Sequence, residues 1–200
     1  GLSEDNSQTI LTYTPVAVAE DKYVLSLNEL ENIHFENLTI QCTDTTADVT
    51  VLVENADNIS FQEMNFASPK TVRSTMLSFV KTDNITISRN NFVGAAVQLA
   101  ISDTVKTLSI NNNNFFEFGV SGIRAYDVEN LSIEANHLST DTSKLIVTAV
   151  DLKRLSGTIR VLSNSLYLTK GTAVRTGISL KEVYSEQIQP AIVANNSISM

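Results

Sequence analysis

The chain has 200 residues, of which 42% are hydrophobic and 18% are charged, and its formal net charge is −8. These proportions are typical of one folded domain, and the negative charge argues against a general role in binding nucleic acids or anionic membranes. The single cysteine, Cys42, excludes an internal disulfide, and with only His34 and His137 beside it the sequence does not favour a cysteine- or histidine-based metal site.

The first 21 residues lack the repeated pattern that fills the rest of the chain. We expect residues 1–21 to form an amino-terminal cap segment and residues 22–200 to form the main body of the fold. Residues 1–8 are polar and acidic, unlike the start of a signal peptide. No apolar run reaches the roughly 18 residues of a membrane span, so we expect no such span.

A pattern of alternating apolar residues followed by a polar turn recurs seven times after residue 31. The copies are NIHFENLTI at Asn32, NISFQEMNF at Asn58, NITISRNNF at Asn84, TLSINNNNF at Thr107, NLSIEANHL at Asn130, TIRVLSNSL at Thr158 and PAIVANNSI at Pro190. A second alternating run precedes each copy: VLSL, VLVE, LSFV, QLAI, GIRAY, AVDLK and GISLK. Alternation with period two predicts two or three short strands in each repeat.

One such unit cannot bury its apolar side alone, whereas stacked units bury a continuous core. The alternation places one inward-facing column in the first strand of each repeat, one in the second strand, and a third after the following turn. The third column consists of Ile40, Phe66, Phe92, Phe115, Leu138, Leu166 and Ile198. Three apolar columns around one axis predict a triangular coil.

Asparagine recurs at one position, just after the second strand of the later repeats. This position is occupied by Asn90, Asn113, Asn136, Asn164 and Asn196. Asparagine tolerates the left-handed backbone region that a sharp turn needs, and its amide carries both donors and acceptors. We therefore predict an internal asparagine ladder. Because Leu38 and Met64 occupy the position in the first two copies, the ladder should begin at the third.

Two coiled architectures compete for this repeat. VKTLSINNNNF and VENLSIEANHL match the leucine-rich pattern LxxLxLxxNxL, but here a second alternating strand follows, where a leucine-rich repeat has a helical side. The order strand, tight turn, strand, Asn turn in GIRAYDVENLSIEANHL resembles the right-handed parallel β-helix of the pectate-lyase-like superfamily, over residues 22–200. We expect an all-β, right-handed parallel β-helix (solenoid) of about seven coils, with a leucine-rich repeat as the alternative.

The resemblance implies a secreted or cell-surface protein of bacteria that process polysaccharides, with a glycan lying along the face of the first strands. Because the loops beside this face are short, we expect a binding or enzyme-derived module; the alternatives are a polysaccharide lyase or hydrolase and a structural stalk or adhesin. Because Met200 ends on a strand with no capping helix, we also expect a further domain or subunit to cover the carboxy-terminal end of the coil.

The outward positions of the first strands carry one group of functional side chains. Adjacent coils lie about 4.8 Å apart, which should bring together Arg124, Tyr126, Asp151, Lys153 and Lys181. The cations can neutralise a uronate carboxylate, and tyrosine offers a flat face and a hydroxyl to a sugar ring. The alternative is that Arg124 and Asp151 form an ordinary cross-strand ion pair.

The sequence alone does not single out catalytic residues. A lyase needs a base, for which Lys153 or Arg124 is the candidate, and a cation such as Ca²⁺, which Asp151 would hold; one carboxylate is few for an ion that takes 6–8 oxygen ligands. The polygalacturonases pair aspartates near a histidine on this face, and the chain has no Asp-Asp pair. A second acidic group, Asp57, Asp83, Asp103 and Asp127, recurs at the tight turns, either as a carboxylate column for a cation or as solvated turn residues.

Overall fold

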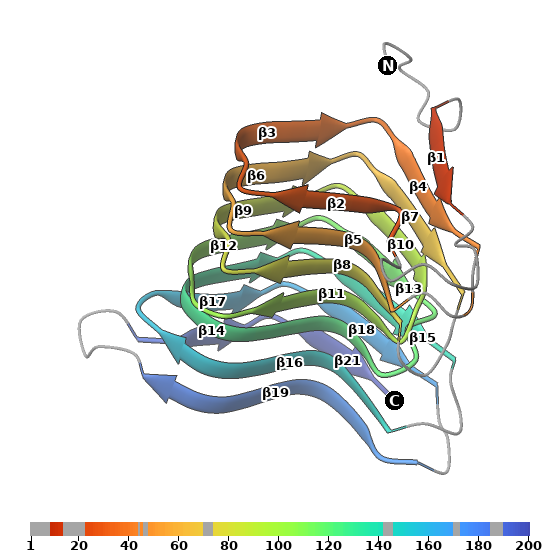
Figure 1. Cartoon of the computed structure of the whole chain (residues 1–200). Helices are drawn as coiled ribbons and strands as arrows, with labels where there is room; N and C mark the ends of the chain where they lie inside the picture. Colours follow the sequence, from red (N-terminus) through yellow and green to blue (C-terminus); the bar gives the residue numbers. More distant parts are fainter. Residues whose placement is uncertain are drawn as a thin grey trace.

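The computed structural model describes residues 9–13, 23–43, 45, 48–69, 74–141, 146–169, 173–184 and 190–200. Throughout these ranges every regular element is a β-strand and every strand pair is parallel. The described residues therefore include no helix that could span a membrane. Figure 1 shows the strands stacked into a coil whose axis runs from the N-terminal to the C-terminal end.

The coil has three faces, named here in the order in which the chain enters them. The first face contains β2 (Leu25–Asn28), β5 (Val49–Glu54), β8 (Thr75–Val80), β11 (Val97–Ser102), the start of β14 (Ser121–Glu134), β16 (Val147–Ser156) and β19 (Arg175–Tyr184). The second face contains β3 (Glu31–Glu36), β6 (Asp57–Gln62), β9 (Asp83–Ser88), β12 (Val105–Asn111), the end of β14, β17 (Ile159–Leu162) and β20 (Ile192–Ala194). The third face contains β1 (Ile10–Tyr13), β4 (Thr39–Cys42), β7 (Asn65–Ser68), β10 (Asn91–Gly94), β13 (Asn114–Phe116), β15 (His137–Thr140), β18 (Ser165–Leu168) and β21 (Ser197–Ser199).

This arrangement confirms the predicted all-β parallel β-helix. The first face holds one strand from each of the seven sequence copies, and the backbone makes about six turns between the first and the last. The segment after each asparagine turn is a strand rather than a helix, so the leucine-rich alternative is wrong. Within the predicted cap segment, β1 pairs with β4 and extends the third face; residues 1–8 and 14–22 lie outside the described part of the chain.

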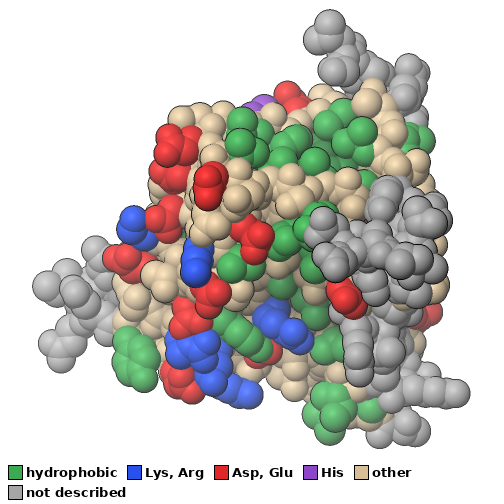
Figure 2. Space-filling view, viewed as in Figure 1, with side chains coloured by type: hydrophobic (Ala, Val, Ile, Leu, Met, Phe, Trp, Pro, Cys, Tyr) green, Lys and Arg blue, Asp and Glu red, His purple; other side chains and the backbone are tan. Residues whose placement is uncertain are grey.

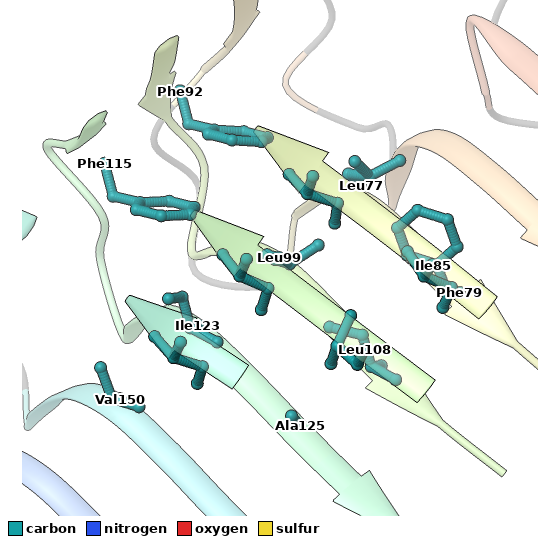
Figure 3. Close-up of a cluster of buried hydrophobic side chains, with 14 of the residues drawn as sticks. Leu77, Phe79, Ile85, Phe92, Leu99, Leu108, Phe115, Ile123, Ala125 and Val150 are labelled. Atoms are coloured by element: carbon teal, nitrogen blue, oxygen red, sulfur yellow. The ribbon is translucent and has the colours of Figure 1, made fainter. Parts of the chain in front are cut away.

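The interior is formed by the predicted apolar columns. Residues of the third column from Ile40 to Leu166 are at most 2% exposed, and the aromatic members stack. The ring centroids of Phe66 and Phe92 are 4.8 Å apart and those of Phe92 and Phe115 are 4.7 Å apart, with nearly parallel planes. Figure 3 shows Phe92 and Phe115 beside the leucine and isoleucine side chains that the other two faces direct inward. Stacking of identical rings favours one register between neighbouring coils.

The predicted asparagine ladder is present at the turn between the second and third faces. Successive side chains are joined by Nδ2–H···Oδ1 bonds of 2.9 Å for Asn90–Asn113, 3.0 Å for Asn113–Asn136, 3.0 Å for Asn136–Asn164 and 2.9 Å for Asn164–Asn196. At its upper end Asn90 Oδ1 accepts the backbone N–H of Met64 at 2.9 Å. The ladder begins at the third copy, as predicted, because methionine has no amide to extend it.

The left-handed backbone at this turn belongs to a different residue from the one expected. The residues immediately before the ladder positions have φ between 55° and 57°, and they are Arg89, Asn112, Ala135, Ser163 and Asn195. The ladder asparagines do not have positive φ. Asparagine therefore recurs at the ladder position because of hydrogen bonding in a buried site, where one amide satisfies several buried backbone groups at once.

Candidate functional site

The first face brings together the five residues predicted from the sequence. The strand register pairs Arg124 with Asp151, Tyr126 with Lys153, and Lys153 with Lys181. These residues, called the first-face patch below, lie on β14, β16 and β19 and point outward, since the alternate residues Ile123, Ala125, Val150 and Leu152 are fully buried. In Figure 2, acidic and basic side chains gather at the lower left of this face, over the same three strands.

Tyr126 and Asp151 form the best-defined contact of the patch. The Tyr126 hydroxyl donates a hydrogen bond of 2.6 Å to Asp151 Oδ2 on the next coil. Burial raises the pKa of Tyr126, and the hydrogen bond to the Asp151 carboxylate raises it further. The phenol is therefore protonated at neutral pH, and it fixes the orientation of the carboxylate beside Arg124.

Arg124 stands without a carboxylate partner. Its side chain is half-buried, and its Nε is buried without any hydrogen-bond partner. No ion pair joins it to Asp151 in the described structure, so the alternative of an ordinary Arg124–Asp151 ion pair is wrong. The reason is geometric: Asp151 turns diagonally toward the Tyr126 hydroxyl. An unpaired buried donor such as the Arg124 Nε–H costs about 1–3 kcal/mol.

The edge of the patch contains charged residues that the alternation along the strands did not predict. Arg154 donates two hydrogen bonds to Asp127, of 2.5 and 2.6 Å, and its guanidinium lies 5.9 Å from the centre of the Tyr126 ring. Lys153 Nζ lies 3.3 Å from Glu182 Oε1. Arg154, Asp127 and Glu182 share positive φ values at the turn that follows the first face. Their common turn position in successive repeats is the sequence signal that would have found them.

Asp151 is surrounded by two cations and two hydroxyl groups. Arg124 and Ser179 are its partners across the sheet, Tyr126 lies diagonally, and Lys153 is on the same strand, so Asp151 is the one carboxylate of this group. The described residues contain no group of three His, Cys, Asp or Glu side chains able to hold a metal ion. The first-face patch presents three cations, one phenol hydroxyl and one carboxylate on one surface.

Three of the four turn carboxylates, Asp57, Asp83 and Asp127, have a partner on an adjacent coil. Asp57 accepts a 2.7 Å hydrogen bond from Asn84, and Asp83 lies 2.7 Å from Lys106 Nζ. Burial opposes ionisation of Asp83, but the hydrogen bonds and charge of Lys106 outweigh it and lower the pKa of that carboxyl. Asp83 and Asp127 thus belong to surface ion pairs, whereas Asp57 accepts a hydrogen bond from a neutral amide. This geometry favours the interpretation as turn residues over that of a shared cation site.

No family model, curated protein or solved structure matches this chain.

Proposed function

We propose that this chain is a glycan-binding module of a secreted or cell-surface polysaccharide-processing protein, and that the first-face patch contacts an acidic sugar chain. The observation that carries the proposal is the Arg124 guanidinium, which no carboxylate of the described residues neutralises although it sits in a protein of net charge −8. A cation kept half-buried and unpaired on a flat sheet is suited to a carboxylate supplied from outside.

The remaining residues of the patch suit the other parts of such a ligand. The uronate carboxylate would accept hydrogen bonds from Arg124, while the half-buried Tyr126 ring offers an apolar face to the pyranose ring. Asp151 Oδ1 remains available to a sugar hydroxyl, because the Tyr126 bond uses Oδ2. Lys153 and the exposed Lys181 continue the cationic surface along the coil axis, at the strand spacing of about 4.8 Å, toward the next sugar units.

The alternative is a polysaccharide lyase or hydrolase of the pectate-lyase-like superfamily, using the same face. Hydrolysis of a glycosidic bond ordinarily uses two carboxylates that flank it, whereas Asp151 is the only carboxylate among the five patch residues. A lyase would need Lys153 or Arg124 as its base. The patch therefore supports binding more strongly than cleavage, and the two are separated by measuring products.

A panel of acidic and neutral polysaccharides in affinity gels, with and without Ca²⁺, tests the proposal. We expect polygalacturonate or another uronate polymer to retard the wild-type protein, and Arg124→Ala to weaken the retardation at least about tenfold, as for loss of a desolvated charge-assisted contact. Arg89→Ala, which removes an exposed cation paired with Glu63 on another turn, is the matched control and should bind like the wild type. Unsaturated products absorbing in the ultraviolet would establish a lyase instead.

Failure of every polysaccharide in that panel would leave the stalk or adhesin alternative, in which the coil serves as a stiff rod. One surface suits an assembly role: the last rung exposes Val193 by 46% and Ile198 by 44%, whereas their partners one coil earlier, Val161 and Leu166, are buried. A further domain or subunit covering β19, β20 and β21 would bury these side chains. Sedimentation of the wild type and of Ile198→Lys tests whether that partner is a second copy.

A further inference from the structure

The third face carries an outward-facing array that the first-face patch does not use. Its outward residues on β7, β10 and β13 are, strand by strand, Asn65 and Ala67, Asn91 and Val93, and Asn114 and Phe116. This set is called the third-face grid below. It has one row of amides and one row of apolar side chains, both running parallel to the coil axis.

The amide row is oriented by its own hydrogen bonds. Asn91 Nδ2 donates to Asn65 Oδ1 at 3.0 Å, and Asn114 Nδ2 donates to Asn91 Oδ1 at 2.8 Å. Each amide has two N–H groups and an oxygen with two lone pairs, so Asn91 keeps one N–H and one lone pair for solvent or a ligand. These remaining groups repeat at the strand spacing of about 4.8 Å. The hydrogen bonds along the row fix the direction in which they point.

The apolar row lies two residues further along the same strands. Val93 is 42% exposed, and the half-buried Phe116 ring stands outward with its centroid 5.6 Å from that of His137. A pocket of about 370 Å³ opens beside this row and includes Gln41, Ala67, Val93, Gly94 and Glu117 in its lining. That volume is at the lower end of the range of ligand pockets, about 300–1,000 Å³.

The grid is held rigid from beneath. The buried residues between the two rows are Phe66, Phe92 and Phe115, whose rings stack directly below it. Binding of a ligand that matches the grid therefore costs little conformational entropy in the protein, because the amides and the strands are already ordered.

The chemistry of the grid selects an uncharged ligand. None of its six residues is charged, and the carboxylate in the pocket lining, Glu117, would repel an anion. A ligand charge buried here would have no counter-charge, whereas hydroxyl groups can exchange water for the amides without that cost. The apolar row in turn requires a ligand with a flat apolar side.

We propose that the third-face grid is a second binding site, for an extended neutral polysaccharide of β-linked hexose or pentose units. The sugar hydroxyls along one edge bond to the row from Asn65 to Asn114, and the C–H faces of the rings lie on Val93 and Phe116. The pocket beside Val93 accepts a ring or branch at the end of the contact. The site is independent of the first-face patch, because it lies on another face and selects the opposite kind of ligand.

Titration of the ¹⁵N-labelled protein with cellohexaose and xylohexaose tests this. We expect the side-chain NH₂ signals of Asn65, Asn91 and Asn114 to shift with one saturating curve for at least one of the two sugars. Asn91→Ala and Phe116→Ala should each raise the dissociation constant about tenfold. Asn84→Ala is the matched control, since it removes an exposed, hydrogen-bonded asparagine of the same coil on the second face. It should leave the dissociation constant unchanged.

Several results would overturn the proposal. These are the absence of shifts with either sugar at millimolar concentration, shifts confined to the first face, or equal affinity of Asn91→Ala and Asn84→Ala. A dimer in sedimentation that Phe116→Ala dissociates would also overturn it, by assigning the grid to a second copy of the chain. Arg124→Ala distinguishes the two sites, because it should weaken uronate binding and leave cellohexaose or xylohexaose binding intact.

Discussion

Asparagine occupies two kinds of position in this chain, and burial decides what its amide contributes. Asn113 lies in the internal ladder and is 1% exposed; its Nδ2 donates to Ile87 O at 2.9 Å, and its Oδ1 accepts the backbone N–H of Asn90 at 2.9 Å. Asn114, the next residue, lies in the exposed row of the third face and bonds to Asn91. The same side chain therefore satisfies buried backbone groups at one position and replaces water at the other.

Asn113→Ala should lower the free energy of unfolding by roughly 3 kcal/mol, because it leaves more than one buried backbone group without a partner. Asn114→Ala, one residue away and half-buried on the outward-facing side of its strand, should change it by less than about 0.5 kcal/mol. Urea denaturation of the two variants measures the difference. Equal midpoints for the two would contradict a stabilising role of the ladder.

The Asp127–Arg154 pair makes part of the stability depend on pH. The hydrogen bonds from Arg154 lower the pKa of Asp127 below the ordinary value of an aspartate side chain. A carboxyl whose pKa is lower in the folded state stabilises the fold above its unfolded pKa, and this contribution is lost as the pH falls through the folded pKa. We expect the urea midpoint of the wild type to fall more steeply below about pH 4 than that of Asp127→Asn. Asp103→Asn, at the equivalent turn of the previous coil, is the control; if its profile matched that of Asp127→Asn, the pair would not be the cause.

At the scale of the strand and turn, close approach of neighbouring coils sets the residue type. At the end of β10, Gly94 has φ of +92°, and a Cβ built on it would come 1.9 Å from the backbone oxygen of Ser68 on the coil above. Glycine is the residue that fits both the backbone conformation and this separation. The contact also brings β7 and β10 together at the pocket of the third face.

Gly94→Ala should therefore lower the free energy of unfolding by at least roughly 2 kcal/mol, since both the positive φ and the backbone clash oppose the added methyl group. The control is Gly122→Ala, because its Cβ would meet the side chain of Leu138 at 2.8 Å and a side chain can shift where a backbone cannot. Thermal unfolding of both variants provides the test. A smaller loss for Gly94→Ala than for Gly122→Ala would show that the coil separation adjusts at this position.

For the whole molecule, the coil behaves as a one-dimensional stack in which each rung contacts only its neighbours. The middle rungs have partners on both sides, whereas β19, β20 and β21 are covered on one side and expose Val193 and Ile198. Stability should therefore be unequal along the axis, because local opening is easiest where fewest apolar contacts are lost.

Hydrogen exchange measured residue by residue should show this gradient. We expect the amides of β9 and β12 to exchange through global unfolding, and those of β20 and β21 to exchange faster by local opening. Equal protection of the last rung and the middle rungs would indicate that something covers the end of the coil in solution, as a second copy of the chain would.

The sequence by itself determined the solenoid, its apolar columns and the starting point of the asparagine ladder. These follow from alternation along one strand and from a repeat between coils, both of which are visible in the order of residues. It also placed Arg124, Tyr126, Asp151, Lys153 and Lys181 on one surface, because equivalent positions of successive repeats lie side by side in the parallel sheet. Only the tertiary structure decided that Asp151 bonds to Tyr126 and leaves Arg124 unpaired, that Arg154 joins the edge of the patch, and that residues before the ladder hold the left-handed turn. The physical reason is that such contacts run diagonally between residues about 25 positions apart. Several neighbours on the adjacent coil are within reach of each side chain, and the length and rotamer of the side chain, which the repeat does not specify, determine which of them it contacts.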